Sequence, residues 1–327
     1  MTEMISGRAT DREYTDNEIL SFVSELESLP GGDLTVALLV GCGQRAVGPL
    51  RQFLLNGRPR GIFQPRQRAV EALGQLGATN VLVEYLSYKR NIADAIVRFG
   101  EEAVESSAAR ELARWQSDEI FYFLLKLGQE RMLPGVVDAL GSFGRPEAAA
   151  VFLKALRDDV CRPIAEEALR RIARETKQEL IAAARTVPLD RDETPSERQG
   201  RRSVVRILSD LDLNVAECNE LKPLLEDQDS EIAIMAAEMA LNWAPATDKN
   251  AAAQFLISRL DSAHWFMQIR IQECLCRNYY QVRELIQKTS TLRRQKAKGE
   301  PLADPVLRIL ERVQSRMANS GSRERKA

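Results

Sequence analysis

Residues 224–241 read LLEDQDSEIAIMAAEMAL, and this stretch contains the pattern that decides the fold. A pair of leucines closes one apolar segment, an acidic turn follows, and a second apolar segment runs on to Trp243. Apolar residues in the second segment stand three or four positions apart, at Ile232, Met235, Ala236, Met239, Ala240 and Trp243. Because this spacing puts them on one face of a helix, the stretch predicts two amphipathic helices joined by a short turn.

Pairs of the same kind recur along most of the chain. An aromatic residue or leucine followed by leucine or isoleucine begins at Phe53, Tyr85, Phe123, Phe152, Leu180, Leu224, Phe255 and Leu285. The steps average about 33 residues, the length of a helix pair in repeat proteins. The longest step contains residues 187–200, which are polar and include two prolines. With no competing strand pattern, we predict an all-α chain of roughly eight helix pairs and a loop or linker at 187–200.

The stretch quoted above resembles the junction between two HEAT repeats. Residues 156–169 are similar, and residues 137–156 resemble the shorter HEAT-like repeats of bacterial phycobilisome lyases. The resemblance covers most of residues 33–288. It implies an armadillo-like α-α superhelix, an α-solenoid in which the second helix of each pair lines a concave surface. Its members include scaffolds, adaptors, lyases and DNA glycosylases, so the resemblance indicates a fold and leaves several functions open.

The same patterns suggest an order of segments along the chain. We expect a flexible N-terminus at 1–15, HEAT-like repeats at 16–186 and the linker at 187–200. Further repeats and a capping helix would follow at 201–317, and a disordered tail at 318–327.

Composition narrows the range of functions. The 46 Lys and Arg residues nearly balance the 47 Asp and Glu residues, which disfavours nucleic-acid binding through overall charge. The only histidine is His264, and the five cysteines include no CxxC pair, so the sequence offers no evident metal site or His-based relay. We therefore predict a non-enzymatic protein without cofactors. The N-terminus is polar and no apolar run is long enough for a membrane span, which predicts a cytoplasmic protein.

Two motifs resemble catalytic or nucleotide sites. Residues 41–46 fit G-x-G-x-x-A, but no acidic residue stands about 20 positions later, where a dinucleotide site needs one. We interpret this motif as the end of a helix. Trp115, Asp118 and Glu119 invite comparison with HEAT-like alkylpurine DNA glycosylases, which combine aromatic residues and a carboxylate with a basic groove.

We predict a scaffold or adaptor that binds a macromolecule, a protein in the first place, on its concave face. The contact candidates are polar residues outside the apolar stripes of the second helices: Arg51, Gln52, Tyr88, Lys126, Lys154 and Gln254. A nucleic-acid binder of the glycosylase type and a chromophore-lyase-like subunit stay open as alternatives. A basic concave face would favour the first, and an apolar cleft beside a cysteine the second.

Overall fold

Every regular element in the described part of the chain is helical. The computed structural model describes residues 14–28, 31–57, 62–188, 190–296 and 304–324. Over these ranges it contains 18 α-helices, three short 3₁₀ helices and no strand. The all-α prediction is confirmed. Among these residues, none of the helices combines the length and apolarity that a membrane crossing requires.

Contacts divide the chain into two compact units, Met1–Val151 and Phe152–Ala327. Unit 1 contains α1 (Asp16–Glu25), α2 (Gly32–Gly41), α3 (Val47–Asn56), α4 (Gln64–Gln75), α5 (Thr79–Ser87), α6 (Ala95–Ala113), α7 (Asp118–Glu130) and α8 (Pro134–Phe143). The boundary lies within α9 (Ala149–Ala155) and not at the linker that we expected.

Unit 2 contains the second half of the helices. They are α10 (Arg162–Ile172), α11 (Lys177–Arg185), α12 (Pro195–Ser209), α13 (Val215–Leu221), α14 (Ser230–Trp243), α15 (Ala246–Arg259), α16 (Trp265–Arg277), α17 (Tyr279–Lys296) and α18 (Pro305–Glu324).

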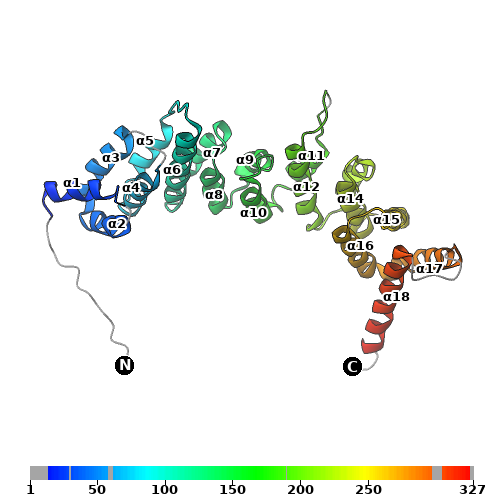
Figure 1. Cartoon of the computed structure of the whole chain (residues 1–327). Coiled ribbons are helices and arrows are strands. Elements are labelled where there is room, and N and C mark those ends of the chain that lie inside the picture. Colours follow the sequence, from blue (N-terminus) through cyan, green and yellow to red (C-terminus); the bar gives the residue numbers. More distant parts are fainter. Residues whose placement is uncertain (1–13, 29–30, 58–61, 189, 297–303, 325–327) are drawn as a thin grey trace, which may run out of the picture. The chain divides into compact units, whose positions relative to one another are not determined.

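Each unit is built from contacts between helices close in the chain (Figure 1). In unit 1, α2, α4, α6 and α8 contact one another in order, and so do α1, α3 and α5. In unit 2, α10, α12, α14, α16 and α18 form one such row, while α11 contacts α13 and α15 contacts α17. Apolar side chains between the rows are buried, as the helical stripes predict. Helices within a row pack closely: a Cβ on Gly135 of α8 would lie 2.1 Å from the carbonyl oxygen of Ser106 on α6.

Ion pairs link helices at a spacing close to one repeat. The partners stand 26 to 35 residues apart in pairs such as Arg131–Glu105, Arg201–Asp227, Arg145–Asp118, Arg110–Asp138, Arg45–Asp16, Arg270–Glu238, Arg51–Glu84 and Arg68–Asp33. This range includes the period of about 33 residues expected for a helix pair. In these pairs, each arginine meets an acidic residue that lies about one helix pair away in the sequence.

Side-chain caps account for several helix starts. Thr15 and Glu18 form the capping box that their spacing predicts, with Glu18 N–H donating to the threonine hydroxyl at 3.3 Å. The same spacing, Thr176-x-x-Glu179, predicts a second box, but this prediction is wrong, because the Thr176 hydroxyl donates to the Ile172 carbonyl at 2.9 Å. The hydroxyl thus closes the preceding turn and does not start α11.

Glycines end some helices but not all that the sequence suggests. Gly77 and Gly144 have φ of 72° and 60°, the left-handed conformation typical of a helix end. Gly43 of the G-x-G-x-x-A motif also has positive φ, at 63°, and follows α2, so the interpretation as a helix end is confirmed. The apolar run before Gly100 also predicts a helix end, but Gly100 lies inside α6, because Asp94 caps the start of this helix only six residues earlier.

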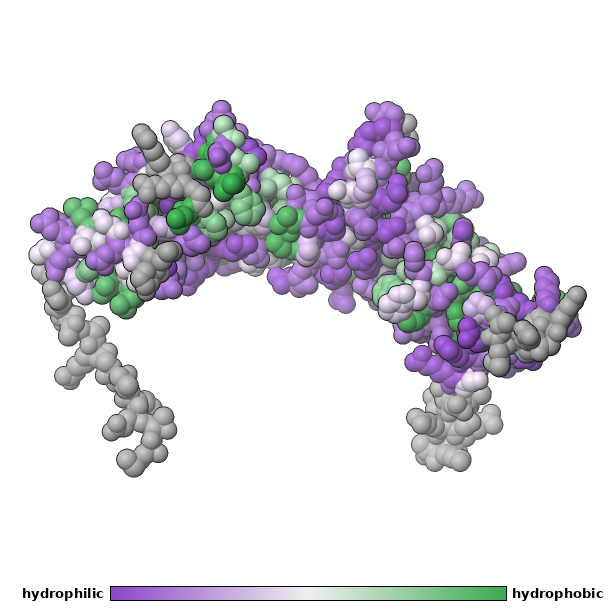
Figure 2. All heavy atoms as spheres, in the orientation of Figure 1, coloured by the Kyte–Doolittle hydropathy of each residue, from purple (hydrophilic) through white to green (hydrophobic). Residues whose placement is uncertain are grey.

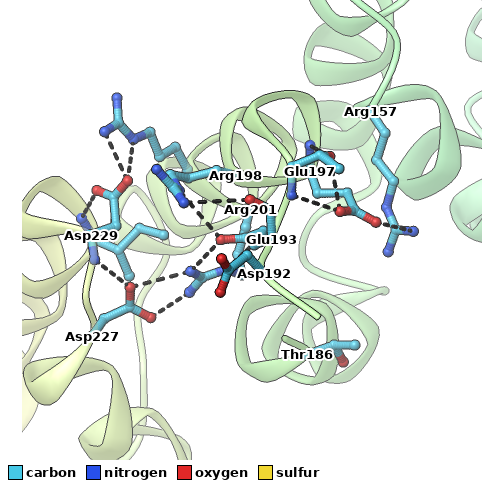
Figure 3. Close-up of polar contacts among 12 residues, drawn as sticks. Arg157, Thr186, Asp192, Glu193, Glu197, Arg198, Arg201, Asp227 and Asp229 are labelled. Carbon is cyan, nitrogen blue, oxygen red and sulfur yellow. Dashed lines mark hydrogen bonds and ion pairs between the residues drawn. The ribbon is translucent and has the colours of Figure 1, made fainter. Parts of the chain in front are cut away.

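The predicted loop at 187–200 is shorter than expected. Residues 195–200 form the start of α12, because Pro195 occupies its first turn and the Thr194 capping box fixes its beginning. Figure 3 shows how the preceding segment is held: Arg201 lies between two carboxylates, with Nε 2.8 Å from Glu193 and Nη1 2.5 Å from Asp227. The side chains of all three are almost fully buried. Because residues 187–200 are polar and contain two prolines, the sequence predicts the start of this helix too late in the chain.

The two chain ends also differ from expectation. Of the N-terminal segment 1–15, residues 1–13 lie outside the described residues, and Thr15 caps α1. The tail expected at 318–327 is helical through Glu324, because it contains no proline to stop α18, and residues 325–327 lie outside the description. The basic run 289–299, expected as a loop, is helical as far as Lys296, the end of α17.

Candidate partner-binding surface

The six predicted contact residues are exposed and fall in both units. Arg51 and Gln52 lie on α3, Tyr88 directly follows α5, Lys126 lies on α7, Lys154 on α9 and Gln254 on α15. The first four belong to unit 1, and Lys154 and Gln254 to unit 2. The surface of unit 1 therefore brings together the larger share of the predicted set.

Arg51 already has a partner within unit 1. Its Nε and Nη2 lie 2.8 and 2.5 Å from the two carboxylate oxygens of Glu84 on α5. The hydrogen bond from Arg51 lowers the pKa of the Glu84 carboxyl, although both side chains remain about half exposed. An exposed pair of this kind adds little stability, so its main effect is to hold two long side chains at a fixed place beside Gln52.

A groove separates α5 from α7. It has a volume of about 250 Å³ and is lined by Leu86, Ser87, Lys89, Phe123, Lys126, Leu127, Glu130 and Arg131. Lys89 and Glu130 form an ion pair across it, with Nζ 3.2 Å from the carboxylate. Lys126, which was predicted from its helical position alone, thus lies in a groove with an apolar floor and a charged rim.

A buried ionic network lies behind this surface. Glu101 on α6 accepts hydrogen bonds from the Tyr85 hydroxyl at 2.7 Å and from the guanidinium groups of Arg66 and Arg90. The three charged side chains are at most 11% exposed. Burial, together with the negative charge of Glu101, raises the pKa of the Tyr85 hydroxyl, which therefore remains a hydrogen-bond donor.

The arginines of this network also bind the end of α3. Arg66 donates to the Leu54 carbonyl at 2.7 Å, and Arg90 donates to the carbonyls of Leu54 and Leu55 at 3.2 and 3.1 Å. These carbonyls belong to the last turn of the helix, where backbone acceptors lack helical partners. The two cations therefore satisfy the carboxyl end of α3 and tie it to α6 through Glu101.

Arg131 makes equivalent contacts in the next helix pair. It donates to the Glu105 carboxylate at 2.8 Å and to the Leu86 carbonyl, in the last turn of α5, at 2.7 Å. Burial raises the pKa of Glu105 in spite of the hydrogen bond from Arg131. The wall of the α5–α7 groove is thus fixed by a buried pair.

The network brings together segments that carry exposed apolar side chains. Ile62, Tyr88, Ile96 and Phe99, called the apolar patch below, are 62%, 64%, 73% and 70% exposed. Ile62 stands four residues before Arg66, Tyr88 two before Arg90, and Phe99 two before Glu101. Since Arg66 and Arg90 both contact Glu101, the three segments lie close together. Figure 2 shows hydrophobic residues gathered around the connection between α5 and α6.

The apolar patch was not identified from the sequence, apart from Tyr88. Phe99 precedes Gly100, and the sequence at 95–100 resembles the last turn of a helix that ends at a glycine. The residue in the sequence that could have revealed the exposure of Phe99 is Asp94. Its carboxylate accepts hydrogen bonds from the backbone of Ile96 and Val97 and so starts a helix there. A helix that starts at residue 95 exposes Phe99 in its second turn.

Other sequence candidates lie on elements outside the α5–α7 groove. The Asp118 carboxylate is engaged by Arg145, whose Nη1 lies 2.6 Å away, and the Trp115 side chain is about half exposed. His264 is exposed at the start of α16. In the described ranges no three His, Cys, Asp or Glu side chains are grouped so that they could hold a metal ion.

The thiols are shielded as well. Burial raises the pKa of Cys161 and of Cys274 to about 12, so both are protonated near neutral pH and are poor nucleophiles.

Neither a scan against protein-family models nor a search of curated proteins found a match for this chain.

Proposed function

We propose that this chain is a non-catalytic α-solenoid of HEAT-like helix pairs that serves as a scaffold or adaptor for a protein partner. The contacts between alternate helices, and ion pairs spaced by about one repeat, support this arrangement. The 16 helices from α2 to α17 would form eight pairs, with α1 and α18 at the ends. The second helices, α3, α5 and α7 among them, would line the concave face.

The apolar patch is the observation that carries the proposal. Four large apolar side chains, each more than 60% exposed, are held by segments that a buried ionic network fixes in place. Protein interfaces combine such an apolar centre with a polar rim, and a few aromatic anchors provide most of the affinity. Tyr88 and Phe99 would be these anchors, and the rim would include Arg51, Lys89 and Lys126.

The two alternatives find no support at this surface. A nucleic-acid site would need cations available to phosphates, whereas Arg51 and Lys89 are paired with Glu84 and Glu130. A chromophore-lyase-like subunit would be favoured by an apolar cleft beside a cysteine, and the residues that line the α5–α7 groove include no cysteine. The partner that fits is a protein that presents apolar side chains of its own.

The proposal is tested by affinity capture with an Ile96→Ser/Phe99→Ser variant. Both side chains are exposed, so the variant should fold normally. Val160→Ser in unit 2 is the matched control, because Val160 is an equally exposed apolar residue, at 68%. Captured proteins are identified by mass spectrometry, and binding is then measured with the purified partner.

A partner of the patch should bind the natural chain and the control variant with equal affinity. We expect the double variant to bind it at least tenfold more weakly, as for loss of a central aromatic anchor. Equal capture of every protein by the natural chain and the double variant would show that the patch is not the docking site.

A further inference from the structure

Charged residues are distributed unevenly along the chain, although the chain as a whole is nearly neutral. Residues 262–327 hold 14 Lys and Arg residues against 6 Asp and Glu residues, a net charge of +8. The rest of the chain holds 32 against 41, a net charge of −9. The last segment of unit 2 is therefore basic, and any polyanion that approaches the protein is attracted there.

Some of this charge lines a groove between α16 and α18. The groove has a volume of about 490 Å³ and is lined by Gln272 of α16 and by Arg308, Glu311, Arg312, Ser315 and Arg316 of α18. The three arginines are four residues apart, so they form one row along the helix with a rise of about 6 Å between neighbours. Such a row offers successive cations to a ligand with successive negative charges.

Two of the three arginines, Arg308 and Arg312, are not paired with the nearby carboxylate of Glu311. Glu311 accepts a hydrogen bond from Arg294 of α17 at 2.6 Å and is thereby engaged. Arg308 and Arg312 are exposed and form no ion pair with any described residue. Arg316 lies beside the Cys276 thiol, where its charge opposes the rise in the pKa of the thiol that burial causes.

A second groove lined by arginines, in unit 1, provides a comparison. In unit 1, Arg68 and Arg114 line a groove of about 410 Å³, but the same groove contains their acidic partners. Arg68 is 3.1 Å from Asp33, and Arg114 is 3.0 Å from Glu111. The row on α18 differs because two of its cations have no such partner among the described residues.

The other wall of the α16–α18 groove continues into exposed aromatic side chains. Trp265, Ile269, Gln272 and Cys276 are spaced by four, three and four residues, so they share one face of α16, the face that contributes Gln272 to the groove. Trp265 is 72% exposed, and its ring meets that of Phe266 edge to face at 6.1 Å between centroids. The groove thus combines a row of arginines with an exposed indole.

We propose that the groove between α16 and α18 binds single-stranded nucleic acid. Arg308, Arg312 and Arg316 contact successive phosphates, and Trp265 stacks on a base at the end of the groove nearer the start of α16. Cations along the backbone and aromatic platforms for bases are the two features by which proteins hold single strands without reading sequence. An acidic peptide or an anionic lipid surface would use the arginines, but neither explains an exposed tryptophan on the same face. The site lies in unit 2 and does not depend on the apolar patch.

The test measures binding of fluorescein-labelled 12-nucleotide oligouridylate and oligothymidylate to the full chain by fluorescence anisotropy. Salt is varied from 50 to 200 mM. The variants are Arg308→Gln/Arg312→Gln and Trp265→Ala, whose side chains are exposed. The matched control is Arg98→Gln/Arg174→Gln, which removes the same charge from exposed arginines outside the groove.

Three phosphate contacts should give log K a slope of about −2 against log salt concentration. We expect Arg308→Gln/Arg312→Gln to reduce this slope by about 1.4 and the affinity at low salt at least tenfold, while the control leaves both unchanged. Trp265→Ala should weaken oligonucleotide binding about tenfold and leave binding of an abasic 12-mer unaffected.

The assignment is overturned if neither oligonucleotide binds at 50 mM salt, or if the arginine variant binds both as well as the natural chain. Stronger binding of polyglutamate, or of phosphatidylserine vesicles, that is lost in the same variant would assign the groove to another polyanion. Circular dichroism at 222 nm verifies that each variant remains helical.

Discussion

Removing one charge from the buried network of unit 1 should destabilise that unit strongly. The Glu101 carboxylate, 5% exposed, accepts hydrogen bonds from Arg66, Arg90 and Tyr85. The substitution Glu101→Gln retains the shape of the side chain but leaves two guanidinium groups without their counterion. Water can replace the counterion only poorly, because the three charged side chains are at most 11% exposed.

The expected cost follows from the burial of these groups. Removing one partner of a buried ion pair typically costs about 3–5 kcal/mol. A unit of 151 residues loses roughly 2–4 °C of melting temperature per kcal/mol, so unit 1 should melt about 6–20 °C lower. The neighbouring substitution Glu102→Gln is the control, since Glu102 is exposed and should change the free energy of unfolding by less than about 0.5 kcal/mol.

The measurement is urea unfolding of the full chain, followed through the fluorescence of Trp115. Trp243 and Trp265, both in unit 2, are replaced by phenylalanine in every sample so that the signal reports unit 1 alone. A difference of less than about 1 kcal/mol between Glu101→Gln and Glu102→Gln would refute the reasoning, because the network would then contribute no more than a surface pair.

Three further outcomes are expected. Gly135→Ala places a Cβ against the backbone of α6 and should destabilise unit 1 by more than about 2 kcal/mol in the same urea assay. Gly48→Ala is the control: no atom lies within 4 Å of the added Cβ, so it should stabilise unit 1 by about 0.5 kcal/mol. Trypsin should cut after Arg191, in the loop before α12, before it cuts after Arg198, which is helical; equal rates on a gel time course would contradict this. Burial raises the pKa of Asp304, but hydrogen bonds from the backbone of α18 and from an arginine outweigh this and hold it below its ordinary value. Since the ionised form is favoured in the fold, its contribution to stability is present above about pH 4 and is lost as the pH falls further. The protection factors of the α18 amides, each corrected for the intrinsic exchange rate at that pH, should therefore fall in acid, and less so in Asp304→Asn.

The helices were predictable because their signal is periodic and local. The stripe from Ile232 to Trp243 and the recurring Phe-Leu pairs depend only on spacing, and α14 lies where the stripe predicts it. Boundaries were less predictable, because they depend on which side chain caps the backbone. Pro195 marks a loop in composition but begins a helix once Thr194 is in place.

The candidate surface was predictable only where exposure follows from helical phase. Tyr88 and Lys126 were found in this way. The network of Glu101 was not, because a carboxylate and two arginines separated by up to 35 residues give no periodic signal, and their contact is decided by tertiary packing. The arginine row on α18 was not predictable either. Its spacing is that of an ordinary charged helix face, and only the residues packed around it in the fold show that two of its arginines lack an acidic partner among the described residues.

The ion pairs between helices about one repeat apart have a consequence for how such a chain can change in length. Arg110 on α6 meets Asp138 on α8, and Arg51 on α3 meets Glu84 on α5, so these helices carry the partner for the helix two places away. A duplicated segment of two helices would bring both halves of these pairs with it and recreate them at the new junction. Loss of a single helix would instead oppose side chains that do not match. Gene duplication in whole pairs is therefore the change that this interleaved charge pattern tolerates best.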